Sequence, residues 1–274
     1  MLNHARVLVP TVALATACAG LLTGGASAEE VEAQRVSLER RIHDDDVRES
    51  SGLARSTFNR PLLWTHNDSG DQPRIFAIKR NGSTKGVLNI RGASFRDWED
   101  MAYGPGHSLW IGDIGDNGRA RDYVTVYKVR EPRKVRTRSV PSTRYDFRYP
   151  DGAHDAEGLF VRPRTGRVFI VSKSRDGGAL YRAPKRLSTT STNKLTKVRS
   201  VPVSITAAAF RPGGGLVLTN HNFVYVYKSM KSAPRTFRKP HVGQGESLEV
   251  ARNSRSVLLG AEGKNSPVYR MTLR

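Results

Sequence analysis

The chain has 274 residues and a strongly basic balance, with 45 lysine and arginine residues against 25 aspartate and glutamate residues. Its only cysteine, Cys18, lies in an apolar N-terminal stretch, so the rest of the chain has no disulfide, thiolate metal ligand or cysteine nucleophile. The positive charge favours an anionic partner, either a cell-wall polymer or a small anionic ligand. Nucleic acid is disfavoured because the basic residues are not interleaved with aromatic residues. We expect a monomer.

The N-terminus has the pattern of a secretory signal peptide. An apolar run over residues 7–22 precedes the small-residue motif at 26–28, which predicts cleavage after Ala28 and a secreted protein. The mature chain, residues 29–274, is then a single domain with no transmembrane segment. Lipid anchoring through Cys18 is less favoured, because alanine occupies the position three residues earlier where a leucine-like residue is expected.

A pattern of three strands recurs five times along the mature chain. The first strand of each repeat begins with small or acidic residues, at 51–54, 99–102, 157–160, 206–210 and 246–250. A second, apolar strand follows at 62–66, 109–113, 168–172, 216–220 and 257–261. A third strand carries an aromatic residue in register in all five repeats, at 74–78, 126–129, 179–182, 224–227 and 268–271.

This repeat predicts an all-β fold, a single β-propeller of five four-stranded blades. Candidate fourth strands lie at 87–90, 144–147 and 198–201, but the last repeat ends directly after its third strand. An alternating segment at 36–42 can supply the missing strand, so that the two ends of the chain pair and close the ring. A pair of β-sandwich domains is the alternative, but it does not predict the three-strand repeat.

Carboxylates stand where the first strands begin, and four repeats therefore direct acids toward one axis. Like charges gathered in this way require a cation, protonation or basic partners. Ca²⁺ suits a set of oxygen ligands, whereas zinc and iron fit poorly without cysteine or closely spaced histidines. The predicted calcium ligands are Asp97, Glu99, Asp155, Glu157 and Glu246. The alternative is that strand-end amides or basic side chains satisfy these acids.

A second polar set follows the apolar second strands, in the loops after residues 66, 113, 172 and 220. Acid, base and cation at equivalent places are compatible with hydrolysis, in which a histidine transfers a proton and a lysine stabilises negative charge. The candidate catalytic residues are Asp113, His66, Lys173 and His221. A histidine at a strand end is more often a hydrogen-bonded structural residue.

Further polar residues accompany both sets and could belong to the same site. They are Asn67, Asp68, Asp100, Asp116, Asn117 and Asn220. Asn, Asp and Gly are also ordinary turn residues, so a turn-forming role is the competing interpretation.

The motifs Asp97-Trp98-Glu99-Asp100 and Gly112-Asp113-Ile114-Gly115-Asp116-Asn117 resemble a family of secreted bacterial β-propeller proteins. That family is loosely similar to the phytase-like and lactonase-like calcium propellers. The resemblance covers nearly the whole mature chain and implies a propeller with acidic, calcium-binding residues near its axis. Phytase-like propellers usually have six blades, whereas the repeat in this chain gives five, so the resemblance does not extend to that activity.

Two functions follow from these expectations. The first is a secreted propeller with a calcium-binding centre that acts as a binding or scaffold protein of the cell envelope. The alternative is a metal-dependent hydrolase of a phosphoester, a lactone or a glycoside. The first is favoured because the basic balance is strong and no complete catalytic motif is present.

Overall fold

The structure, a computed structural model, describes residues 34–241, 243 and 245–274. The predicted signal peptide therefore lies outside the described residues. Within the part that is described, all regular secondary structure is β-strand.

The strands form five groups of four, which are the predicted blades. Blade one contains β2 (Ser50–Arg55), β3 (Leu63–Asn67), β4 (Arg74–Ile78) and β5 (Thr84–Arg91). Blade two contains β6 (Trp98–Gly104), β7 (Ser108–Asp113), β8 (Val124–Arg130) and β9 (Arg138–Arg148). Blade three contains β10 (Ala156–Val161), β11 (Val168–Ser172), β12 (Gly178–Arg182) and β14 (Thr196–Val201). A short strand, β13 (Asn193–Lys194), pairs with β9.

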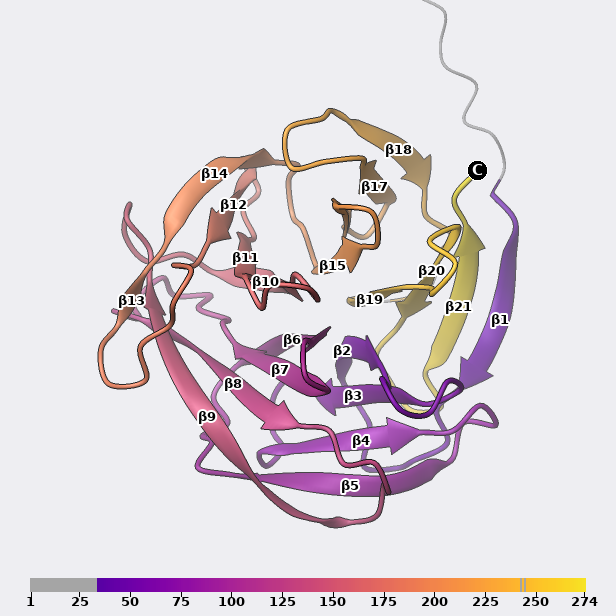
Figure 1. Cartoon of the computed structure of the whole chain (residues 1–274). Helices are drawn as coiled ribbons and strands as arrows, with labels where there is room; N and C mark the ends of the chain where they lie inside the picture. Colours follow the sequence, from indigo (N-terminus) through magenta and orange to yellow (C-terminus); the bar gives the residue numbers. More distant parts are fainter. Residues whose placement is uncertain (1–33, 242, 244) are drawn as a thin grey trace, which may run out of the picture. The chain divides into compact units, whose positions relative to one another are not determined.

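The remaining two blades complete the ring. Blade four contains β15 (Ala207–Arg211), β16 (Gly215–Thr219), β17 (Phe223–Tyr227) and β18 (Pro234–Arg238). Blade five contains β19 (Ser247–Val250), β20 (Ser256–Gly260), β21 (Pro267–Thr272) and β1 (Val36–Arg41). The first strands β2, β6, β10, β15 and β19 surround the centre, and each contacts the next around the ring (Figure 1).

The ring closes through pairing of the two ends of the described chain. Strand β1 runs antiparallel to β21, with Val36 opposite Met271 and Arg41 opposite Pro267. The predicted closure is confirmed, and it removes the free edge that a three-stranded last blade would expose. A parallel pairing of β5 with β9 joins blades one and two, which the repeat pattern did not predict.

The hydrophobic core is divided among the junctions between blades. Five clusters of buried apolar side chains are found among the described residues, one at each junction. The second strand of every blade is buried along its whole length, because neighbouring blades cover both faces of each sheet. This burial explains why those strands are apolar runs without alternation.

Candidate metal centre

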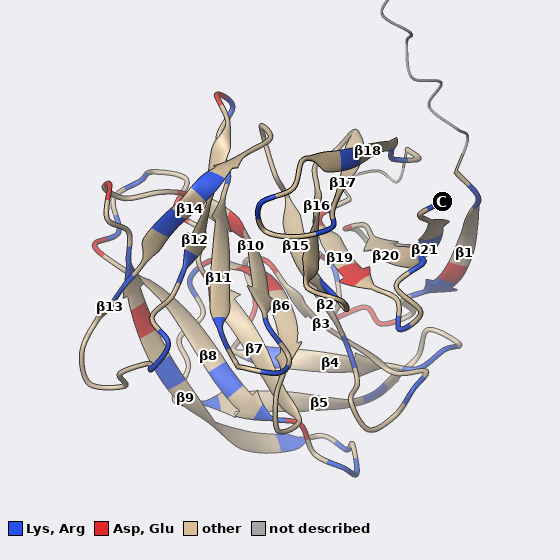
Figure 2. Cartoon of the chain, turned by 45° about the horizontal axis from the view of Figure 1, so that its top comes forward, with Lys and Arg blue, Asp and Glu red and all other residues tan. Residues whose placement is uncertain are grey.

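One end of the ring collects the polar residues that the sequence singled out. The first and second strands of a blade are antiparallel, so each first strand begins where the second strand ends, as Ser50 opposite Asn67 and Trp98 opposite Asp113 show. Acids at both places in several blades therefore meet at the same end. We call this set the acidic mouth; it consists of Glu49, Asp68, Asp97, Glu99, Asp155, Glu157, Glu246 and Glu262. Many of the basic strand residues lie on outer strands such as β9, β14 and β18 (Figure 2).

Two groups of three carboxylates are close enough to share a cation. Asp68, Asp97 and Glu99 offer ligand atoms that all lie within 4.8 Å of one another. Asp68 also forms such a group with Glu246 and Glu262. Asp68 is therefore the common member, and three predicted ligands fall into the two groups.

The loop after β3 places Asp68 between blades. Its backbone N–H donates a hydrogen bond to the carbonyl of Glu49 (2.9 Å), and its carbonyl accepts one from the N–H of Trp98 (3.1 Å). These bonds fix the loop of blade one against the beginning of β6 in blade two. The carboxylate oxygen Oδ1 of Asp68 is buried and has no hydrogen-bond partner among the described residues.

Burial and mutual repulsion make these acids hard to ionise. Burial, followed by repulsion from Asp97, raises the pKa of Asp68 to about 7. Burial, followed by repulsion from Glu157 and Asp68, raises the pKa of Glu99 well above its usual value. The pKa of Glu262 rises to about 8 through burial and its hydrogen bond with Glu246. A bound cation would favour the ionised forms of all three acids.

The other two predicted ligands have partners within the protein. Glu157, 5% exposed, forms an ion pair with Lys173. Burial raises the pKa of Glu157 to about 8 although Lys173 opposes the rise, and its Oε2 has no partner among the described residues. Asp155 accepts a hydrogen bond from the backbone N–H of Asp116 (2.9 Å). Both acids therefore border the two carboxylate groups without belonging to either.

The candidate catalytic residues lie in contrasting environments. His66 is fully buried, hydrogen-bonds through Nδ1 with the carbonyl of Asn67 (2.8 Å) and has its pKa lowered by burial to about 4. Asp113 forms a buried ion pair with Arg121 (2.8 Å). His221 lies in the exposed loop after β16. Among these residues, Lys173 alone is ion-paired with a member of the acidic mouth.

Three of the six accompanying polar residues hold turns. The Oδ1 of Asn67 accepts the N–H groups of Arg48 (3.0 Å) and Glu49 (3.1 Å). Asn220 accepts the N–H groups of Asn222 and Phe223 in the same manner.

The loop after β7 is organised in the same way. The Asp116 carboxylate accepts the N–H groups of Ala120 (3.0 Å) and Arg121 (2.8 Å). Asn117, by contrast, is exposed. The turn-forming interpretation therefore describes the contacts of Asn67, Asn220 and Asp116.

Asp100 lies between inner strands of three blades. It is completely buried, and its Oδ2 accepts the N–H groups of Leu159 (2.8 Å) and Ala208 (3.2 Å) while Oδ1 accepts that of Met101 (2.8 Å). These donors belong to β10, β15 and β6. Asp100 therefore ties three first strands together around the axis.

Sequence reasoning missed Glu262 and Arg121. Glu262 lies two residues after the second strand of blade five, and Asp68 directly follows that of blade one, so a comparison of all five loops would have found it. Arg121 lies in the connection between β7 and β8, where it pairs with Asp113 and donates to the carbonyl of Gly115 (2.8 Å). Its position carried no pattern in the sequence.

Gly115 leaves the space in which two of the carboxylates lie. A Cβ atom at this position would stand 2.2 Å from Oε1 of Glu99 and 2.3 Å from Oδ2 of Asp97. We expect Gly115→Ala to displace both acids and to weaken the calcium binding proposed below about tenfold, measured by calorimetric titration. Gly118→Ala is the matched control, because a Cβ there would meet nothing within 4 Å. Equal affinities for the two variants would contradict this geometry.

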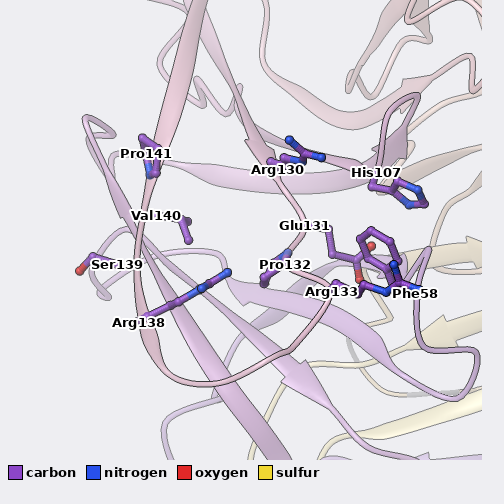
Figure 3. A pocket seen from close by; sticks show the side chains of 10 residues that line it. All are labelled: Phe58, His107, Arg130, Glu131, Pro132, Arg133, Arg138, Ser139, Val140 and Pro141. Carbon is purple, nitrogen blue, oxygen red and sulfur yellow. The ribbon is translucent and has the colours of Figure 1, made fainter.

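A further cavity lies away from the acidic mouth. It has a volume of about 680 Å³ and is lined by residues 130–133 at and after the end of β8 and 138–141 at the start of β9, together with Phe58 and His107 (Figure 3). The two rings stack with their centroids 3.8 Å apart. Glu131 in its wall accepts hydrogen bonds from Trp64 Nε1 (2.9 Å) and the N–H of Thr57 (2.8 Å), which gives it a structural role. None of the predicted site residues lines this cavity.

Comparisons with known proteins identify the architecture. No protein-family model matches the chain, and no curated protein matches its sequence. The PQQ-bound form of an aldose sugar dehydrogenase from Streptomyces coelicolor has a TM-score of 0.52 at 10% identity, covering 88% of this chain and 98% of that one. The fold is a β-propeller.

Two further solved structures are similar. An auxiliary nutrient binding protein from Bacteroides thetaiotaomicron has a TM-score of 0.52 at 9% identity, covering 87% of this chain and 76% of that one. A gluconolactonase from Xanthomonas campestris has a TM-score of 0.49 at 15% identity, covering 89% of this chain and 91% of that one. At such identities the similarity concerns the fold, and function must be argued from the site. No helix that could cross a membrane is found among the described residues.

Proposed function

We propose that this propeller binds Ca²⁺ at its acidic mouth and acts outside the cell as a binding or scaffold protein of the envelope. The observation that carries the calcium site is the pair of carboxylate groups that share Asp68, whose buried Oδ1 has no partner among the described residues. Asp68, Asp97 and Glu99 would hold one side of the site, and Glu246 and Glu262 the other.

The donor set suits calcium better than other common metals. Ca²⁺ accepts six to eight oxygen ligands in flexible geometry, and carboxylates and backbone carbonyls provide them. Zinc sites are built mainly from cysteine and histidine, and neither of the two groups contains either residue. The bound ion would neutralise part of the repulsion among the acids and connect blades one, two and five.

The envelope role rests on charge and on the expected secretion signal. An excess of 20 positive charges favours adsorption to an anionic cell-wall polymer, and the N-terminal pattern predicts export. Acids are concentrated at the mouth, whereas basic residues are distributed over the outer strands (Figure 2). The polymer would therefore meet the outer surface, and the calcium site would stabilise the ring.

Two measurements test this proposal. Calorimetric titration of the purified protein with Ca²⁺ should show saturable binding, and the absence of saturable heat would overturn the metal centre. Co-sedimentation with purified anionic wall polymer at about 150 mM salt should exceed that of an unrelated protein of equal charge. Equal sedimentation of the two proteins would overturn the envelope role.

The raised pKa values predict that calcium stabilises the protein more at high pH. Without calcium, protonation of Asp68 (pKa about 7) and Glu262 (pKa about 8) stabilises the folded state, and this contribution is lost as pH rises through those values. Calcium replaces the protons, so the increase in melting temperature on adding calcium should be larger at about pH 8.5 than at about pH 5.5. Thermal unfolding at both pH values, with and without calcium, measures the difference. An increase that does not change with pH would show that these acids do not hold the ion.

A hydrolase is the second candidate, and the Glu157–Lys173 pair favours it. Glu157 has an unpartnered Oε2 and a pKa of about 8, so it can hold a proton at neutral pH, while Lys173 offers positive charge to a developing anion. Calcium, when bound, would supply further electrostatic stabilisation.

The hydrolase proposal is tested by substrate screening. Lactones, phosphoesters and glycosides should be assayed with calcium present, and Lys173→Gln should abolish any turnover that is found. Asp113→Asn distinguishes a catalytic residue from a structural one. Asp113 is paired with Arg121, so this substitution should affect activity only through the shape of the loop after β7. Turnover that survives Lys173→Gln would rule out this mechanism.

A further inference from the structure

A second charged site of opposite sign lies at the other end of the blades. A cavity of about 280 Å³ lies between blades one and five, where β2 and β19 end, whereas the acidic mouth lies where those strands begin. We call it the arginine cavity, after the six arginines that line it: Arg40, Arg55, Arg60, Arg80, Arg252 and Arg270.

Arg40 is held rigidly at the wall of this cavity. It is only 6% exposed and donates hydrogen bonds to the carbonyls of Pro61 (2.9 Å), Ile78 (3.1 Å) and Lys79 (3.1 Å). Arg40 belongs to β1, so these bonds join the closing strand of blade five to blade one. Its Nε is buried and has no hydrogen-bond partner within the described ranges.

The acids in the wall leave the arginines largely uncompensated. Glu39 forms ion pairs with two arginines, Arg270 at 2.8 Å and Arg40 at 3.6 Å. Glu249 accepts the backbone N–H of Arg55 (3.0 Å). Among the described residues that line the cavity these are the only two acids, so positive side chains outnumber negative ones by four.

Like-charge crowding is visible in the electrostatics of two arginines. Burial lowers the pKa of Arg40, and the charges of Arg80 and Arg270 add to the effect against the opposing contribution of Glu39. Burial likewise lowers the pKa of Arg252, with Arg55 as the next contributor. An anion in the cavity would relieve this repulsion.

Two arginines at the rim are available to a ligand. Arg60 lies in the loop before β3 and Arg80 in the turn after β4, and both are exposed. No hydrogen bond or ion pair of either side chain is found within residues 34–241, 243 and 245–274. Their guanidinium groups can therefore turn toward a bound anion without breaking a contact in the protein.

We propose that the arginine cavity binds a small phosphate-bearing molecule. Guanidinium groups form paired hydrogen bonds with phosphate, and the tetrahedral oxygens accept donors that arrive from several directions, as they do in this cavity from β1, two loops of blade one and the β19–β20 loop. The volume lies near the lower end of the range of small-molecule sites, which suits a compact anion. The ligand would connect blades one and five beside the ring closure.

Calorimetric titration with inorganic pyrophosphate tests this proposal. The protein is first freed of calcium on a chelating resin, so that pyrophosphate cannot bind through a metal at the acidic mouth. The result is then independent of the proposed calcium site. At about 150 mM salt we expect saturable binding of one pyrophosphate per chain. Arg60→Gln and Arg80→Gln should each weaken it about tenfold or more, since each loses charge-assisted hydrogen bonds.

The controls separate a built site from general attraction to a basic protein. Arg186→Gln removes the same charge from an exposed position outside the cavity and should leave the affinity unchanged. Citrate, which offers planar carboxylates, should bind at least about tenfold more weakly than pyrophosphate. Lack of saturation, an equal loss in Arg186→Gln, or citrate binding as tight as that of pyrophosphate would each overturn the proposal. The thermal midpoints of the variants confirm that they are folded.

Discussion

Asp68→Asn should remove most of the stabilisation that calcium provides. A ligand that binds only the native state stabilises it by RT ln(1 + [L]/Kd), about 2.7 kcal/mol at a hundredfold excess over Kd. For a domain of this size, that corresponds to a rise in melting temperature of about 5 °C or more in the wild type. Because Asp68 belongs to both carboxylate groups, the substitution removes one negative charge from each while leaving only a neutral carbonyl oxygen, and calcium should shift the variant by about 1 °C or less.

A matched substitution controls for the lost charge. Asp122→Asn makes the same chemical change at an exposed position, and the variant should keep the full response to calcium. Thermal unfolding of all three proteins, calcium-free and with excess calcium, provides the comparison. A full calcium response in Asp68→Asn would contradict the shared site. If calcium still raises the melting temperature of the double variant Asp68→Asn, Glu99→Gln, the ion binds elsewhere.

Asp100→Ala should strongly destabilise the propeller. The substitution leaves three buried N–H groups, those of Met101, Leu159 and Ala208, without an acceptor. Each unsatisfied group costs about 1–3 kcal/mol, so the free energy of unfolding should fall by about 3 kcal/mol or more. Urea unfolding of calcium-free protein measures this loss separately from any effect on the neighbouring Glu99.

Asp100→Asn distinguishes the hydrogen bonds from the volume of the side chain. Asn keeps the size of Asp and one acceptor oxygen, so this variant should lie between the wild type and Asp100→Ala in stability. A loss within about 0.5 kcal/mol for Asp100→Ala, the range of ordinary surface substitutions, would show that the three inner strands do not depend on this carboxylate.

The fold was predictable because its signals are local and repeated. Each blade needs a small or acidic first strand, a second strand buried on both faces and a third strand with an aromatic residue in register, and five copies of one pattern reinforce the assignment. The closing strand was also predictable, because the alternating segment that includes Leu38 matched a missing partner for β21. The parallel contact between β5 and β9 was not, since it depends on how a long connection crosses between blades.

The candidate site was predictable in its composition and less so in its grouping. Register placed acids at the beginning of four first strands, and Asp97, Glu99 and Glu246 do lie in the two carboxylate groups. The central member, however, is Asp68, which the sequence placed among the accompanying polar residues and not among the predicted calcium ligands. Glu157 was expected beside them, but the ion pair with Lys173 holds it at the border of the groups.

The sequence by itself determined the number of blades, the order of their strands, the pairing of the ends and the end of the ring at which acids collect. These properties follow from alternation and repetition, which are written in neighbouring residues. Only the tertiary structure decided that Asp68 joins two carboxylate groups, that Asp100 ties three inner strands together, and that six arginines converge at the opposite end. Such groupings depend on the twist and packing of whole blades, because a few ångströms separate a shared ligand site from isolated charges.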